Sequence, residues 1–203
     1  MNSLRKLGIL LSGRGSNFLA IADAITSQKL PGAEIAVVIS NHAEAPGLAA
    51  ARERGFPALA IEANGRKRAE HDADIIAALG EHKVDLVCLA GYMRLLSPDF
   101  VRAFPQRILN IHPSLLPAFP GLDAQRQAVE YGVQYSGCTV HFVDEQLDHG
   151  VIVIQRVVSV LPDDDEHSLS ARILEQEHQA YPEAIARVFS GNYQIVGRRY
   201  ELR

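Results

Sequence analysis

Short apolar runs that alternate with helical patterns are the feature of this sequence that most constrains its fold. In the first half of the chain the apolar runs lie at 6–12, 33–40, 57–61 and 84–90. Helical patterns lie between them, at 16–29, between Pro46 and Gly55, and at 66–82. Apolar strands buried on both faces and separated by helices are typical of a parallel sheet with right-handed crossovers. The first half is therefore predicted to be a Rossmann-like α/β unit.

The second half of the sequence predicts a different arrangement. A fifth strand at 107–111 leads into a segment where Pro113, Pro117 and Pro120 exclude regular structure. A helical pattern then covers 123–131.

Two further strands are predicted, followed by helices. The strands, at 137–143 and 151–160, are joined by a polar loop, which indicates an antiparallel addition to the sheet. A helix follows at 168–180, and Pro182 is expected to start a second short helix that ends at Gly191. The predicted fold class is a mostly parallel α/β sheet with an antiparallel C-terminal addition and helices on both faces.

Composition limits the kind of protein this can be. The 203 residues contain 47% hydrophobic and 22% charged residues, which fits one globular domain over 1–203 and no nucleic-acid partner, since the net charge is −4. Cys88 and Cys138 lie in apolar runs, so no disulfide is expected. The N-terminal apolar run is too short for a membrane span, and no signal-cleavage pattern follows it. A cytoplasmic enzyme with small-molecule substrates is therefore expected.

The segment SGRGSN joins the first strand to the first helix. Backbone N–H groups and the helix dipole at such a junction favour a phosphate, and Gly13 and Gly15 permit close approach. Ser16 is expected to cap the helix. Phe18 stands where the third glycine of a dinucleotide motif belongs, so a tight turn with a helix cap explains the segment equally well.

Asn110 and His112 lie two residues apart on the fifth strand, so both side chains are expected to project to the same side. They stand where a strand ends, which is where ligands bind in open α/β sheets. An amide donor beside a histidine suits stabilisation of an oxyanion in acyl transfer. A histidine packed under the proline-rich loop remains the alternative.

The polar loop between the last two predicted strands contains several acidic residues. They can form a solvated turn, or one carboxylate can reach His112 and orient its ring. His141 and His149 lie nearby, but their spacing matches no standard zinc signature, so no metal is expected. Arg94 follows a predicted strand, and Arg68 opens a predicted helix. Each arginine is either a ligand contact or a surface charge.

A family resemblance rests on five segments, which are SGRGSN, LAGYMRLLSP, LNIHPSLLPAFPGL, VHFVDEQLDHG and LEQEHQAYP. In order and spacing they resemble the motifs of the phosphoribosylglycinamide formyltransferase family, from about residue 6 to about residue 188. NIHPSLLP is shared by several formyl-folate enzymes, whereas the following PGL resembles the glycinamide ribonucleotide branch.

The resemblance implies a Rossmann-like formyltransferase fold. It also implies transfer of a formyl group from (6R)-10-formyltetrahydrofolate, as co-substrate, to the amine of glycinamide ribonucleotide in purine synthesis, without a metal. The implied catalytic residues are Asn110, His112 and Asp148. The implied ribonucleotide contacts are Gly15, Ser16, Asn17 and Glu177. The implied folate contacts are Arg68 (with Arg66 and Lys67 as neighbouring alternatives), Met93, Arg94, Leu95, Leu96, Asn110, Val143 and Asp144.

The sequence departs from many relatives in two places. Asp123 and Gln125 stand where those relatives carry histidines after PGL, and His149 precedes Gly150 where they carry two glycines. The second difference is expected to stiffen or reshape the folate loop.

Other functions explain less of the sequence. A formyltetrahydrofolate deformylase would hydrolyse the same donor, but that family adds an N-terminal regulatory domain. A methionyl-tRNA formyltransferase would need a further tRNA-binding domain and more positive charge. A non-catalytic Rossmann module that binds a nucleotide explains SGRGSN but not Asn110 and His112. A monomer or a homodimer is expected.

Overall fold

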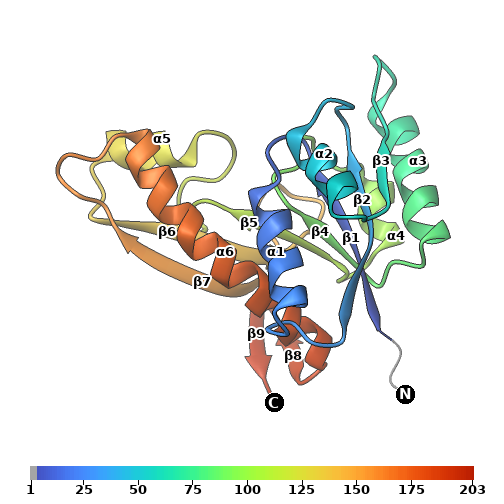
Figure 1. The fold of residues 1–203 in the computed structure, drawn as a ribbon. Helices are drawn as coiled ribbons and strands as arrows, with labels where there is room; N and C mark the ends of the chain where they lie inside the picture. The colour runs from blue at the N-terminus through green and yellow to red at the C-terminus, as the bar shows by residue number, and fades with distance from the viewer. Residues whose placement is uncertain (1–3) are drawn as a thin grey trace. The chain divides into compact units, whose positions relative to one another are not determined.

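The computed structural model describes residues 4–203, and the chain divides into two compact units (Figure 1). The first unit is Met1–Leu109 and the second is Asn110–Arg203. The first unit contains the glycine-rich segment. The second contains Asn110, His112 and the acidic loop.

The first unit is a parallel sheet with helices between its strands. The strands are β1 (Arg5–Leu11), β2 (Ala33–Ser40), β3 (Ala58–Ala60) and β4 (Leu86–Leu89). The helices are α1 (Ser16–Thr26), α2 (Pro46–Glu53), α3 (Arg68–Glu81) and α4 (Pro98–Ala103). The strand order is β3-β2-β1-β4, with β1 parallel to both β2 and β4 and β2 parallel to β3. The predicted Rossmann-like unit is confirmed.

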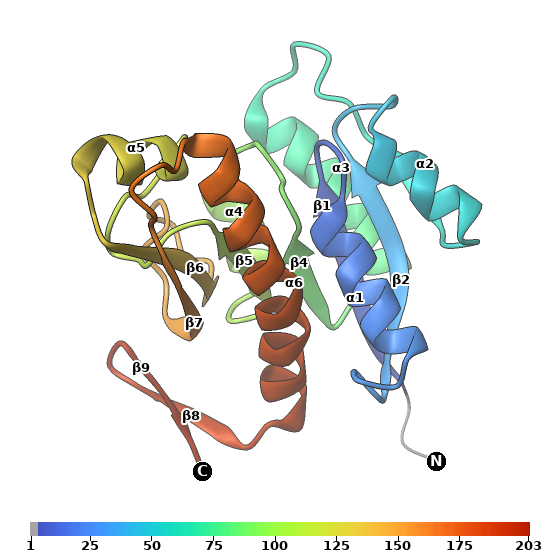
Figure 2. The ribbon, with the colours of Figure 1, turned by 60° about the vertical axis from the view of Figure 1, so that its left-hand side comes forward.

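Strand β1 forms the centre of this unit and is buried on both faces. Leu7, Ile9, Leu10 and Leu11 are all fully buried. Helix α1 contacts α2, and α3 contacts α4. Figure 2 shows these two pairs on opposite sides of the strands. Because helices cover both faces, these strands are continuous apolar runs rather than alternating ones.

Helix α4 is absent from the sequence-based prediction. Its start nevertheless carries a recognisable signal, because the Ser97 hydroxyl accepts a hydrogen bond from the Phe100 N–H at 3.3 Å and Pro98 occupies the first turn. The helix is short, so it shows little of the apolar periodicity on which the other helices were identified.

The second unit combines strands of both directions with two helices. The strands are β5 (Ile108–His112), β6 (Tyr135–Phe142), β7 (Ile152–Ser159), β8 (Tyr193–Val196) and β9 (Arg199–Leu202). The helices are α5 (Ala124–Tyr131) and α6 (Glu166–Ser190). The strand order is β5-β6-β7-β9-β8, and β6 and β7 pair antiparallel. The predicted antiparallel addition is confirmed.

The β8–β9 hairpin was not predicted. Strands β8 and β9 pair antiparallel, and β9 lies parallel to β7 where Ile152 pairs with Arg199. The turn is Gly197-Arg198, with Gly197 at φ 62°. A glycine-containing two-residue turn between short runs with tyrosine and aliphatic residues is a hairpin signal that the sequence does contain.

The prediction of a helix break at Pro182 was wrong, because α6 is continuous and contains Pro182. A proline inside a helix removes one backbone hydrogen bond and crowds the preceding turn. Here the neighbouring side chains Tyr181 and Ile185 are fully buried, and α6 packs on β6 and β7. Burial of this apolar face outweighs the local cost of the proline.

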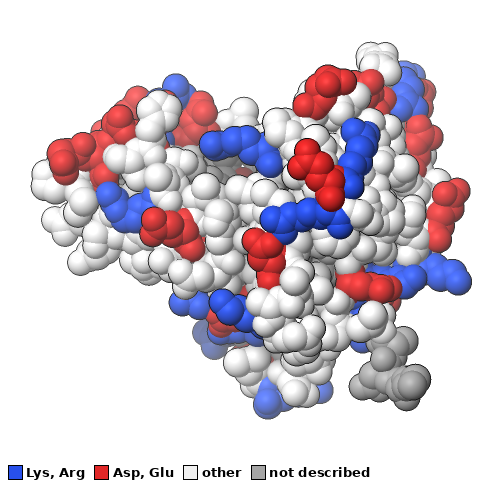
Figure 3. Space-filling model, in the orientation of Figure 1, with Lys and Arg blue, Asp and Glu red and all other residues white. Residues whose placement is uncertain are grey.

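The surface and the cysteines fit the sequence analysis. Cys88 and Cys138 are buried free thiols, as predicted. Among residues 4–203 there is no helix with both the length and the apolar character needed to cross a membrane. On the face shown in Figure 3, acidic and basic side chains are interspersed.

Gly8 on β1 provides a test of the packing of the first unit. A β-carbon at this position would lie 2.4 Å from Leu79 Cδ2 and 3.0 Å from both γ-carbons of Val84. Gly8→Ala is therefore expected to lower the free energy of unfolding by about 1–3 kcal/mol through overpacking. Gly80→Ala is the control, because a β-carbon there meets nothing within 4 Å. Chemical denaturation measures both, and equal stability of the two variants would contradict the packing model.

Candidate active site

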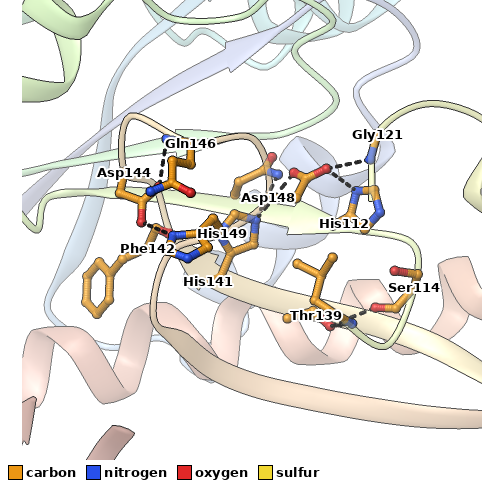
Figure 4. Close-up of polar contacts among 12 residues, drawn as sticks. His112, Ser114, Gly121, Thr139, His141, Phe142, Asp144, Gln146, Asp148 and His149 are labelled. Atoms are coloured by element: carbon orange, nitrogen blue, oxygen red, sulfur yellow. Dashed lines mark hydrogen bonds and ion pairs between the residues drawn. The ribbon is translucent and has the colours of Figure 1, made fainter. Parts of the chain in front are cut away.

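His112 and Asp148 come together in the second unit, although they are 36 positions apart in the sequence (148 − 112). His112 ends β5, and Asp148 lies near the end of the loop between β6 and β7. The Nδ1 atom of His112 is 3.4 Å from Asp148 Oδ2, and both side chains are less than 10% exposed. The same oxygen accepts the backbone N–H of Gly121 at 2.8 Å (Figure 4). A carboxylate does reach His112, one of the two possibilities that the sequence left open.

The ring of His112 faces an oxygen atom at each nitrogen. Its Nε2 atom is 2.8 Å from the carbonyl oxygen of Phe119, and its Nδ1 atom faces Asp148. A neutral imidazole has only one N–H, whereas an imidazolium donates from both nitrogens. These surroundings are fully satisfied only by the protonated ring.

Asn110 is held by His141, a residue that the sequence analysis considered only as a metal ligand. His141 Nδ1 lies 2.7 Å from the carbonyl oxygen of Phe142, so this nitrogen carries the proton. Its Nε2 atom then accepts from the side-chain amide of Asn110 at 3.2 Å. Burial lowers the pKa of His141, against the opposing attraction of the Asp148 carboxylate, and keeps the ring neutral. One amide N–H of Asn110 is thereby fixed, and the other is left for a further acceptor.

The loop after β5 is anchored to β6 and β7 by buried polar groups. Thr139 Oγ1 accepts from the Leu116 N–H at 3.0 Å and donates to the Ser114 carbonyl oxygen at 2.7 Å. The side-chain amide of Gln155 donates to the Leu116 carbonyl oxygen at 2.9 Å. The loop that supplies Phe119 and Gly121 to the site is therefore fixed at its base.

The glycine-rich segment lies in the first unit, at the start of α1. Gly15 has φ 73°, and a β-carbon on it would lie 2.8 Å from the α-carbon of Gly47. The Gly47 N–H donates to the Gly13 carbonyl oxygen at 3.0 Å. The expectation that Ser16 caps α1 was wrong, since Gly15 is the N-cap residue and no side chain among the described residues caps the helix. The close approach of α2 therefore requires a glycine at position 15, immediately before α1.

The carboxyl ends of β1 and β4 meet beside this segment. The Ser12 N–H donates to the Gly91 carbonyl oxygen at 3.0 Å, and the Ser12 hydroxyl accepts from the Met93 N–H at 2.8 Å. In the order β3-β2-β1-β4 the direction of chain progression changes between β1 and β4. Ligands of open α/β sheets bind at such a switch point. The structure thus brings the glycine-rich segment and the segment that begins at Met93 to one ligand-binding edge of the first unit.

The predicted folate contacts of the first unit are accessible. Met93 is 70% exposed and Leu95 is 53% exposed. Arg94, which lies between them in the sequence, and Leu96, which follows, are half-buried. The buried Nε atom of Arg94 has no hydrogen-bond partner within the described part of the chain.

The structure distinguishes among the three basic residues before α3. The guanidinium of Arg66 pairs with Asp74 and also donates to the Glu62 and Ala63 carbonyl oxygens. Arg68 is exposed at the first position of α3. Arg66 is thus already engaged within the protein, whereas Lys67 and Arg68 are both exposed.

The remaining predicted contacts lie in the second unit. Val143 and Asp144 are half-buried at the start of the β6–β7 loop, and Asp144 Oδ2 is 2.8 Å from Nδ1 of His149. Glu177 is buried on α6. Burial, with a further contribution from Glu177, raises the pKa of the Cys138 thiol to about 12. Among residues 4–203, no group of three or more histidine, cysteine or acidic side chains is arranged to hold a metal ion.

Three comparisons with known proteins identify relatives of similar sequence and fold. The formyl transferase family model matches residues 5–185. The chain is 44% identical over 180 residues to phosphoribosylglycinamide formyltransferase of Haemophilus influenzae, covering 88% of this chain and 84% of that protein. The crystal structure of glycinamide ribonucleotide transformylase 1 from Symbiobacterium toebii superposes with a TM-score of 0.95 at 49% identity, covering 98% of this chain and 94% of that one.

Two other relatives are either much longer than this chain or less similar to it in sequence. The trifunctional purine biosynthetic protein adenosine-3 of Drosophila melanogaster is 47% identical over 190 residues, which is 92% of this chain but only 14% of that protein. A formyltetrahydrofolate deformylase from Pseudomonas syringae has a TM-score of 0.92 at 25% identity, and this chain covers 66% of it. With a family match across both units and high identity to relatives of similar length, the chain belongs to the formyl transferase family.

Proposed function

We propose that this enzyme transfers the formyl group of 10-formyltetrahydrofolate to the amine of glycinamide ribonucleotide in purine biosynthesis. The observation that carries the proposal is that the His112 ring lies beside the buried carboxylate of Asp148, while His141, which also faces that carboxylate, fixes the amide of Asn110. Fixed donors of this kind stabilise the oxyanion that forms in acyl transfer. The named relatives of similar length catalyse, by their names, this transfer.

The proposed reaction begins with attack of the substrate amine on the formyl carbon. A tetrahedral intermediate forms, and its oxyanion accepts hydrogen bonds from the Asn110 amide and the His112 ring. Asp148 stabilises the imidazolium of His112 by its charge. The intermediate collapses with cleavage of the bond to the folate nitrogen, and the amine proton passes to that nitrogen through Asp148 or ordered water.

One hydrogen bond of the structure must be exchanged during this reaction. Nε2 of His112 donates to the Phe119 carbonyl oxygen, while Nδ1 faces Asp148. The oxyanion therefore replaces the Phe119 carbonyl as the acceptor at Nε2. Phe119 has φ 51°, an uncommon value for a residue with a bulky side chain.

The two substrates are proposed to use different groups of residues. The backbone N–H groups and the helix dipole at the start of α1 favour the ribonucleotide phosphate at Gly15, Ser16 and Asn17, and Glu177 is a further ribonucleotide contact. The folate is proposed to contact the exposed apolar side chains around Arg94 and the start of the β6–β7 loop. The proposed folate contacts are Arg68, Met93, Arg94, Leu95, Leu96, Asn110, Val143 and Asp144.

The finer properties of the enzyme are also proposals. The oxyanion is stabilised by side-chain donors, so the proposed mechanism requires no metal. The family model spans both compact units, which supports one formyltransferase domain over residues 1–203. We propose a cytoplasmic monomer or homodimer that acts on small molecules and has no nucleic-acid or membrane partner.

The alternatives account for less of the structure. A deformylase would use the same donor with water. The sequence identity of this chain to the deformylase structure is 25%, however, against 49% to the transformylase structure. A non-catalytic nucleotide-binding module would use only the glycine-rich segment. It leaves unexplained why Asn110, His112 and Asp148 come together.

The choice of acceptor tests the proposed function directly. Purified enzyme is incubated with 10-formyltetrahydrofolate, once with glycinamide ribonucleotide and once with water as the only acceptor. Rapid loss of the donor is expected only with the ribonucleotide, because the amine is the better nucleophile in a site built to bind it. Equal rates of donor loss in the two reactions would identify a deformylase instead.

Asp148→Asn tests the role of the carboxylate. The amide keeps the shape of the side chain but removes the charge opposite the His112 ring. We expect kcat to fall by about 10²–10⁴, with a modest change in KM. Asp163→Asn, in the exposed turn before α6, removes the same charge elsewhere in the second unit and should not change kcat. Wild-type turnover by Asp148→Asn would show that His112 is a structural residue.

Arg94→Ala tests the folate contact in the first unit. Loss of a charged donor whose Nε has no partner within the described residues should raise the Kd for the folate by about tenfold or more. Arg54→Ala is the control, since Arg54 pairs with Asp23 on the surface of the same unit. Isothermal calorimetry compares the two variants, and unchanged affinity in Arg94→Ala would make this arginine an ordinary surface charge.

A further inference from the structure

The turn of the β8–β9 hairpin contacts the loop that carries Asp148. Arg198 lies at this turn, and its guanidinium is 2.8 Å from Nε2 of His149. The same guanidinium also donates to the backbone carbonyl oxygen of His149. His149 directly follows Asp148 in the chain, so Arg198 holds both the side chain and the backbone of the next residue.

The His149 ring links Arg198 to the start of the loop. Its Nδ1 atom is 2.8 Å from Asp144 Oδ2, and the other oxygen of Asp144 accepts the Gln146 N–H at 2.9 Å (Figure 4). A neutral imidazole with its proton on Nδ1 donates to Asp144 and accepts from Arg198 at Nε2. A carboxylate, an imidazole and a guanidinium thus form one chain of contacts across the loop.

The hairpin also packs on the other end of the loop through aromatic rings. Phe142 precedes the loop and stacks on Tyr193 of β8, with ring centroids 6.3 Å apart. Tyr193 stacks in turn on Tyr200 of β9, with centroids 4.7 Å apart and an interplanar angle of 19°. The hairpin therefore contacts the chain both before Val143 and after Asp148.

We propose that the β8–β9 hairpin is a brace for the loop 143–148, and that Arg198 is a positioning residue for Asp148 that acts through His149. The inference rests on the proposed catalytic role of Asp148. Asp148 has φ 49°. Its carboxylate accepts the Gly121 N–H at 2.8 Å and lies 3.4 Å from Nδ1 of His112. A shift of about 1 Å in such a group can cost up to a hundredfold in rate.

The proposal separates catalytic from structural effects. The Asp144 and His149 side chains are 42% and 43% exposed, and exposed ion pairs add little to global stability. Loss of Arg198 should therefore leave the melting temperature almost unchanged. Its effect should be confined to the motion of the loop and to turnover.

Arg198→Ala and Arg199→Ala form the matched test. Both remove one arginine from an exposed position of the hairpin, but the Arg199 side chain is not among the groups that contact the loop. For Arg198→Ala we expect kcat to fall by about tenfold, with an unchanged KM for glycinamide ribonucleotide. Hydrogen exchange of the amides in 143–150 should become faster. Arg199→Ala should match the parent enzyme in both measurements.

A double-mutant cycle tests whether Arg198 acts through His149. The loss of kcat in Arg198→Ala combined with His149→Ala should be smaller than the sum of the two single losses, because both substitutions remove the contact between the guanidinium and the ring, whereas only Arg198→Ala also removes the contact with the backbone carbonyl. Additive losses would overturn the proposed route through His149. Parent-like turnover and loop exchange in Arg198→Ala would overturn the brace itself.

Asp148→Asn, measured in parallel, separates failure of this inference from failure of the proposed mechanism. If Asp148→Asn is inactive and Arg198→Ala behaves like Arg199→Ala, only the brace is wrong. If Asp148→Asn keeps full turnover, the catalytic role of the aspartate is wrong, and the positioning role of Arg198 is overturned with it.

Discussion

The carboxylate of Asp148 is the group on which the geometry of the proposed catalytic residues depends. One of its oxygens receives the Gly121 N–H and lies opposite His112, so it joins the loop after β5 to the loop after β6. Neither loop has regular secondary structure that would fix the distance between them. A buried carboxylate is costly unless it is hydrogen-bonded or paired, and here the Gly121 N–H and the His112 ring are its partners. The interaction that positions His112 is thus also the one that holds the two loops together.

Two histidines beside this carboxylate have different roles because their surroundings differ. His141 has one acceptor and one donor as neighbours, the Phe142 carbonyl and the Asn110 amide, and burial lowers its pKa. It is suited to remain neutral and to fix an amide. His112 has acceptors at both nitrogens, which suits a cation that donates to a developing negative charge. One site therefore contains a ring that fixes an amide and a ring that faces acceptors at both nitrogens, without any metal ligand set among the described residues.

The local sequence pattern predicted most helices and strands, but it could not predict contacts between residues far apart in the sequence. The limits of β2 at 33–40 follow from its apolar run alone, and two-residue spacing placed Asn110 and His112 on one side. Residue chemistry left open whether a carboxylate reaches His112, and only the family resemblance named Asp148. The contact between His141 and Asn110 spans 31 positions and has no local signal. At Pro182 a strong local rule failed, because burial of α6 against β6 and β7 outweighs it.

The two ends of the loop that carries Asp148 lie so close together that their backbones are in contact. A β-carbon on Gly150 would lie 1.8 Å from the Phe142 carbonyl oxygen, so the two ends of the loop touch through main chain. That carbonyl oxygen is the acceptor for His141, and the Phe142 ring stacks on Tyr193. The start of the loop is therefore fixed by the contacts of Phe142, and its end by Gly150 and by Arg198 at His149. The hairpin contacts both ends, through Tyr193 before Val143 and through Arg198 after Asp148, so it limits the position of Asp148 from both sides of the loop.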